Sequence, residues 1–226
     1  MTSSHTRPTL AALLAAAISA CSSSQGTVQT SPSPRPGGEP TLLSGIAKAQ
    51  ADSARYPYTE ADIQFMSGMI SHHAQAIVMA RWAPTHGASP SVRTLCERII
   101  NAQTDEIALM QQWLRDRRQP VPEASPNGMK MTMGGMEHVM LMPGMLSEAQ
   151  LKQLDAARGT EFDRLFLTFM IQHHNGAVTM VKELFDSYGA GQDQLVFKFA
   201  SDVNIDQTTE IARMEKMLVA LITTPQ

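Results

Sequence analysis

The chain has 226 residues, 43% of them hydrophobic, which provides enough apolar surface for one good-sized core or two small ones. Its formal net charge of −3 leaves no basic surface, which argues against a nucleic-acid-binding protein. Aromatic residues make up only 5%, whereas 16 residues are methionine. Methionine favours helices and supplies a soft sulfur ligand, but it is also a common core filler.

Residues 1–20 have the pattern of a secretory signal, with an apolar run at Leu10–Ala17 that is too short to span a bilayer. The sequence Ile18-Ser-Ala-Cys21 resembles a bacterial lipoprotein box, which would make Cys21 the lipidated first residue of the mature chain. An ordinary secretory signal with an incidental Cys21 is the alternative. Either way we expect an exported protein of the cell envelope, anchored by lipid to the outer side of the cytoplasmic membrane or held in the periplasm.

Residues 21–57 are expected to form a flexible tether and lead-in, because the Ser, Gly and Pro-rich part has almost no apolar side chains to bury. After the tether, helical spacing of apolar residues and clear turn signals predict two helical hairpins, at 59–118 and 160–222. Thr59 and Ser89 are suited to begin the first two helices. The connection at 119–158 is predicted to be a methionine-rich loop followed by a short helix from Ser147.

The two hairpins are copies of one unit. Residues 62–79 and 163–180 share Asp, Phe, Met, Ile, a His-His pair, Ala and Met in register, about a hundred residues apart. The return helices repeat as well, since 103–114 and 207–218 both carry Gln, Glu-Ile and Met at the same spacing. The sequence therefore predicts an all-α, four-helix bundle of residues 58–222 with an approximate internal two-fold axis.

The repeated His-His pairs are the strongest functional signal. In each copy the pair lies on the core-facing side of its helix, with Met one turn before and nearly two turns after it. This arrangement gives eight candidate metal ligands: His72, His73, His173, His174, Met69, Met79, Met170 and Met180. On the return helices, Glu106 and Glu210 share the core-facing stripe with Met110 and Met214.

A carboxylate on a core-facing stripe needs a partner, and the histidines of the facing helix are the nearest sensible ones. A His–carboxylate pair would fix the ring tautomer and aim the other nitrogen at a metal. Asp62 and Asp163 lie on the same face two to three turns earlier and could do similar work. Any one of these residues by itself is more often a core residue than a ligand, but their joint repetition favours a metal site.

The ligand types favour copper. Zinc does not need thioethers, and di-iron bundles require Glu-x-x-His motifs that neither His pair has. Thioether plus imidazole suits copper, with Met favouring Cu(I) and His accepting both oxidation states. In an oxidising location Met is also safer than Cys, and Cys96 is expected to be a small buried residue. His86 lies in a predicted turn and is expected to be exposed.

The connecting loop offers a second set of candidate ligands. Met-x-Met spacing in a Gly-containing segment could wrap a Cu(I) ion, or the same residues could form an apolar cover over the helices. The two interpretations weigh about equally for Met129, Met131, Met133, Met136 and His138.

Together, the segments Asp62–Met79, Gln103–Met110, Pro143–Ser147 and Phe162–Val178 resemble the bacterial family known as domain of unknown function 305. The resemblance covers about residues 58–222 and implies a ferritin-like four-helix bundle. It also implies relatives that are exported copper-binding proteins of the CopM type, linked to copper resistance, with His and Met at the matched positions as copper ligands. Met66 and the return-helix residues Met110 and Met214 join the candidates in this way. Leu167 stands where the first copy has Met66, so the two half-sites differ.

The expected function is thus that of an exported, membrane-tethered protein that sequesters copper or transfers it to a partner protein. It is not expected to be an enzyme, because no nucleophile or substrate pocket is visible in the sequence. Two alternatives stay open. One is a bundle oxidoreductase that uses the same His, Glu and Met site, and the other is a metal-free interaction module with a polar core.

Overall fold

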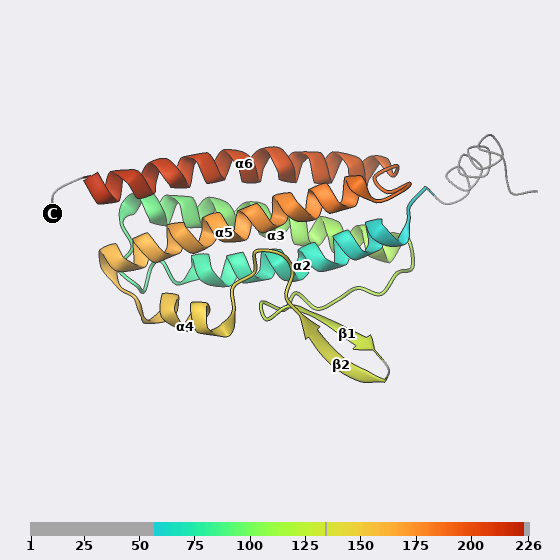
Figure 1. Ribbon diagram of the computed structural model, residues 1–226, viewed down its shortest axis with the longest axis horizontal. Helices are drawn as coiled ribbons and strands as arrows, with labels where there is room; N and C mark the ends of the chain where they lie inside the picture. Colours follow the sequence, from blue (N-terminus) through green and yellow to red (C-terminus); the bar gives the residue numbers. More distant parts are fainter. Residues whose placement is uncertain (1–56, 134, 224–226) are drawn as a thin grey trace, which may run out of the picture. The chain divides into compact units, whose positions relative to one another are not determined.

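Two antiparallel helical hairpins form the body of the structure, a computed structural model that describes residues 57–133 and 135–223 (Figure 1). The first consists of α2 (Glu60–Arg81) and α3 (Pro90–Asp116). Thr59 begins α2 with a capping box, since its side chain accepts from the amide of Asp62 and the Asp62 carboxylate accepts from the amide of Thr59. Ser89 caps α3, whose first residue is a proline, the position where its missing N–H costs nothing.

The second hairpin consists of α5 (Gly159–Asp186) and α6 (Gln194–Thr223). Close backbone contact between long helices occurs within each hairpin and between α2 and α5. Helices α3 and α6 have little close backbone contact with each other, although residues of both line one groove. The two helices that carry the His-His pairs are therefore the two that meet. All described residues belong to one unit of the chain within residues 40–226.

The predicted methionine-rich loop contains a small sheet, and that part of the prediction was wrong. Strands β1 (Met129–Met133) and β2 (Met136–Met140) pair antiparallel, with Met129 opposite Met140. The physical reason is the alternation of Met with polar residues in Met129–Met133, followed by a Gly-Gly pair in the sequence, which suits a two-residue hairpin turn. Helix α4 (Glu148–Ala156) follows, begun by the predicted capping box at Ser147.

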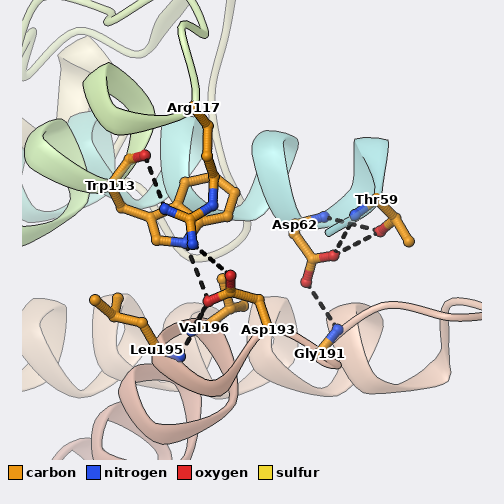
Figure 2. Close-up of polar contacts among 8 residues, drawn as sticks. All are labelled: Thr59, Asp62, Trp113, Arg117, Gly191, Asp193, Leu195 and Val196. Carbon is orange, nitrogen blue, oxygen red and sulfur yellow. Dashed lines mark hydrogen bonds and ion pairs between the residues drawn. The ribbon is translucent and has the colours of Figure 1, made fainter. Parts of the chain in front are cut away.

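Two carboxylates at equivalent positions of the repeat fix the turn of the opposite hairpin. Asp62 Oδ1 accepts a hydrogen bond of 2.7 Å from the amide of Gly191, in the turn between α5 and α6, as Figure 2 shows. Asp163 accepts from the amide of Ser89, in the turn between α2 and α3, at 3.2 Å to each oxygen. Both carboxylates are almost fully buried, so each bond compensates for burying the charge.

A third buried carboxylate ties the last turn of α3 to the start of α6 (Figure 2). Asp193 Oδ1 accepts from the indole of Trp113 and from the amides of Leu195 and Val196, and its Oδ2 is ion-paired with Arg117. The Arg117 guanidinium also lies over the Trp113 ring. These contacts hold the end of the molecule distant from the turn that carries His86.

His86 is buried, and the expectation that it is exposed was wrong. Its ring is 5% exposed, stacks on Trp82, and lies within 2.9 Å of Thr85 Oγ1 and 3.0 Å of Asp155 Oδ1. The ring is covered by Asp155 of α4 and by Phe162 of α5, which the local sequence could not reveal. Cys96 is buried as expected, and burial raises the pKa of its thiol to about 12. The predicted signal, Cys21 and most of the tether lie outside the described residues.

Candidate metal centre

The four histidines of the two pairs come together in the middle of the α2–α5 contact. All four side chains have no exposed surface. The rings of His72 and His173 are 3.8 Å apart between centroids, whereas the two rings within each pair are 6.2 and 6.3 Å apart. The structure thus joins the two repeats into one cluster, here called the histidine quartet: His72, His73, His173 and His174.

The outer member of each pair contacts a carboxylate of its own return helix. His174 Nε2 is hydrogen-bonded to Glu210 Oε2 at 2.7 Å. His73 Nε2 lies 2.7 Å from Glu106 Oε2, at ion-pair distance but without hydrogen-bond alignment. The partnership of the core-facing glutamates with histidines therefore exists in both copies. Each carboxylate is only partly buried, 22% exposed in Glu106 and 27% in Glu210, so it links a buried ring to the solvent.

The other member of each pair, His72 and His173, differs between the copies in its hydrogen-bond partner. His72 Nε2 lies 3.1 Å from the carbonyl oxygen of Pro143, in the segment between β2 and α4. This segment can approach because Gly176 of α5 has no side chain, since a Cβ there would lie 1.9 Å from the same oxygen. Gln75 holds the next residues, donating to the carbonyl of Leu146 and accepting from its amide. His173 has no hydrogen-bond partner at either ring nitrogen.

Nothing in the sequence motif pointed to Pro143, because a backbone carbonyl carries no residue-type signal. The available signals were Gly144 and Gly176, the first with φ +76°, a left-handed conformation that favours glycine. A pair of glycines on two separate segments indicates close approach of backbones, but only the structure shows which oxygen arrives. The linker is therefore part of the site, through its backbone.

Every Nδ1 atom of the histidine quartet is buried without a hydrogen-bond partner. A buried polar atom without a hydrogen-bond partner normally costs about 1–3 kcal/mol of folding free energy. Four such atoms together therefore need a functional explanation. Burial, followed by the neighbouring histidines, lowers the pKa of His72 and His173 well below the usual value. These rings are therefore neutral at physiological pH, and a neutral imidazole offers the lone pair that a metal ion needs.

The candidate methionines of the four long helices are all buried, and they divide between two ends of the quartet. The first group, here the large methionine cluster, belongs to one buried core with Phe65 and Trp113: Met66, Met69, Met110, Met142, Met145 and Met180. The second group, the small methionine cluster, belongs to the other core with Ile99 and Phe166: Met79, Met170 and Met214. Each cluster takes ligand candidates from both hairpins, because α2 and α5 run in opposite directions.

The remaining predicted residues lie apart from the quartet. Asp62 and Asp163 bind backbone amides of the turns and no histidine. On the β-hairpin, Met136 is 66% exposed and His138 is exposed, while Met129 packs against the large methionine cluster. Met131 pairs with His138 across the strands, as Met133 does with Met136, through the backbone.

Within the described residues, no group of three or more His, Cys, Asp or Glu side chains is arranged to hold a metal ion. Imidazoles that lack partners and are flanked by thioethers fit a soft or borderline ion that takes few nitrogen and sulfur ligands. In the same described residues, no helix is sufficiently long and apolar to cross a membrane.

Residues 62–218 match the family described as Domain of unknown function (DUF305). The chain belongs to the DUF305 family. A curated relative, the uncharacterized protein L153 of Acanthamoeba polyphaga mimivirus, is 37% identical over 57 residues, which are 25% of this chain and 38% of the viral protein. The DUF305 chain described here therefore spans well under half of that relative.

Solved structures of the same family are also similar. A DUF305 protein of Streptomyces coelicolor, presumed to be secreted, is 28% identical, with a TM-score of 0.58 over 74% of this chain and 96% of its own. CopM in its Cu(I)-bound form is 28% identical, with a TM-score of 0.52 over 69% of this chain and 94% of CopM. The Cu(II)-bound form gives a TM-score of 0.54 over 70% and 96%. Relatives of this DUF305 protein are thus known with copper bound.

Proposed function

We propose that this DUF305 protein binds copper as cargo in the cell envelope, sequestering the ion or handing it to a partner protein. The observation that carries the proposal is the histidine quartet, in which four buried Nδ1 atoms lack any partner. The copper-bound structures of CopM support the choice of metal. The protein acts by binding rather than by turnover, on a ferritin-like four-helix framework of two hairpins.

The proposed ligands come from both hairpins. His72 and His173 are central, because their rings are adjacent and neutral. Glu106 and Glu210 orient His73 and His174, leaving the Nδ1 atoms available. The thioethers of the two methionine clusters supply the soft donors that hold Cu(I), while imidazole accepts either oxidation state.

Export and anchoring complete the proposal. The segment that ends at Cys21 directs the chain out of the cytoplasm, and a lipid on Cys21 holds it at the membrane. The presumed secretion of the Streptomyces relative supports export. Labelling of cells with a fatty-acid analogue should mark the wild-type chain and leave a Cys21→Ala variant unmarked. Equal labelling of the two would remove the anchor from the proposal.

The proposal is tested by titrating the purified chain with Cu(I) and Cu(II) against a competing chelator. A variant with all four quartet histidines changed to Ala is expected to lose the high-affinity binding. Gln153→Ala is the control, because Gln153 is exposed on α4, is not a candidate ligand and should leave the affinity unchanged. Unchanged stoichiometry and affinity in the quartet variant would contradict the proposed site.

A further inference from the structure

A buried ion-binding cluster needs a route from the solvent. The histidine quartet is fully buried, and α2 and α5 pack closely over it. On the outer side, α3 and α6 are separated by a groove of about 480 Å³. Glu106 and Glu210, the partners of His73 and His174, both line this groove. The groove is therefore lined by the two carboxylates that contact the quartet.

The carboxylates of the groove differ in their exposure to solvent. Asp206 is exposed and lines the groove, Glu106 and Glu210 are partly buried, and the histidines behind them are inaccessible. Asp206, Glu106 and Glu210 line the same groove. Burial, then the charges of Glu106, Asp202 and Glu210, raise the pKa of the Asp206 carboxyl group. Three carboxylates that repel one another would be stabilised by a cation among them.

A second and independent observation comes from two buried amides. Gln103 and Gln207 occupy equivalent positions of the repeat, one on α3 and one on α6, and both line the groove. They are 2% and 4% exposed, and the Oε1 atom of each has no hydrogen-bond partner. Amide oxygens left open in this way can replace water molecules of a hydrated cation as it passes inward.

We propose that the groove between α3 and α6 is the entry port for hydrated Cu(II), with Asp206 at its mouth and Glu106 and Glu210 at its inner end. This inference rests on the proposed copper-binding function and adds the route and the form of the ion. Arg98 and Arg213 also line the groove and weaken the attraction. Among the described residues, neither guanidinium is ion-paired with these three carboxylates.

The port is tested by stopped-flow mixing of the purified chain with Cu(II) at low salt, followed through quenching of the two tryptophans. Asp206→Lys is expected to slow association by about tenfold and to reduce its dependence on salt, because the charge at the mouth is reversed. Asp105→Lys is the matched control, since Asp105 is exposed on α3 and does not line the groove. The dissociation rate is measured in both variants as well, so that slower entry is distinguished from a weaker site.

The outcomes separate the port from the function on which it rests. Slower association in Asp206→Lys than in Asp105→Lys supports the port. Equal association rates in the two variants, with normal copper binding, would overturn the port and leave the proposed function intact. A wild-type chain that binds no Cu(II) at equilibrium would overturn the proposed function, and the port with it.

Discussion

His72 of α2 and His173 of α5 lie with ring centroids 3.8 Å apart, although they are equivalent residues of two separate repeats. Because of this contact, the two His-His motifs form one cluster of side chains and not two separate ones. The joined cluster is asymmetric. Pro143 contacts His72, whereas His173 has no hydrogen-bond partner at either nitrogen.

Burial of these two rings predicts a pH dependence of stability. The pKa of each is lowered in the folded chain, while the unfolded value is near 6.5. Below about pH 6.5 the unfolded chain therefore binds more protons, and folding stability falls by about 1.4 kcal/mol per pH unit for each histidine. Above that pH the two residues contribute no slope.

Urea unfolding of the metal-free chain between pH 7.5 and 5 measures this effect. The double variant His72→Gln, His173→Gln should lose the extra slope and provides the comparison. A wild-type slope no steeper than that of the double variant would show that these rings do not stay neutral through burial.

The glutamates are expected to control affinity through the rings they touch. Glu106→Gln and Glu210→Gln remove a charged acceptor from His73 and His174, so copper affinity should fall by about 10–100-fold in each variant. Glu97→Gln is the control, because Glu97 is exposed on α3. Chelator competition is the measurement, and an affinity in Glu210→Gln equal to that of Glu97→Gln would contradict the orienting role.

The large methionine cluster should matter more for Cu(I) than for Cu(II). Changing Met66, Met69, Met110 and Met180 to Leu removes sulfur at nearly constant volume, at a cost below about 1.5 kcal/mol for each change. We expect Cu(I) affinity to fall at least tenfold and Cu(II) affinity to change less. Met217→Leu, on a partly buried position of α6, is the control. An equal loss for both oxidation states would argue against thioether ligation.

Close approach of the linker to α5 depends on Gly176. Gly176→Ala would place a Cβ 1.9 Å from the Pro143 oxygen, so the linker must move and His72 loses its partner. We expect a loss of about 1–3 kcal/mol in the free energy of unfolding. The exposed neighbour Thr179→Ala should change little. Thermal melts of the two variants decide this, and identical melting temperatures would show that the linker is not held at this point.

Substitution of Asp62 should lower the stability of the fold but leave the copper affinity unchanged. Its buried carboxylate joins α2 to the Gly191 turn (Figure 2), so Asp62→Ala is expected to cost about 1–3 kcal/mol of folding free energy. Copper affinity should be unchanged, with Glu60→Gln as an exposed control in the same helical turn. A large loss of affinity without a loss of stability would place Asp62 at the metal site after all.

The sequence was sufficient for the helices, because caps at Thr59 and Ser89 and the turn residues mark their ends. It also indicated that Glu106 and Glu210 contact histidines, since a carboxylate on a core-facing stripe has few polar groups available as partners. Asp62 shares that stripe with His72, but ten residues of helix separate them by about 15 Å, beyond the reach of either side chain. Spacing along a helix predicts which residues lie on the same face, but it does not predict that they touch one another.

The structure of the linker could not be predicted from the sequence for a different reason. Alternating Met residues are compatible with a loose loop or with a strand, and the pairing of β1 with β2 decides between them. The contact of Pro143 with His72 depends on packing between distant segments, and no residue type in the sequence predicts it. Likewise His86 is buried by a segment roughly seventy residues away, through Asp155.

X-ray absorption spectroscopy of the Cu(I)-loaded chain tests the central claim most directly, because it identifies the atoms bound to copper. The account predicts both imidazole nitrogen and thioether sulfur neighbours, with the imidazole signal lost when the four quartet histidines are changed to Ala. Copper surrounded only by oxygen or nitrogen, with a spectrum unchanged in that variant, would contradict it.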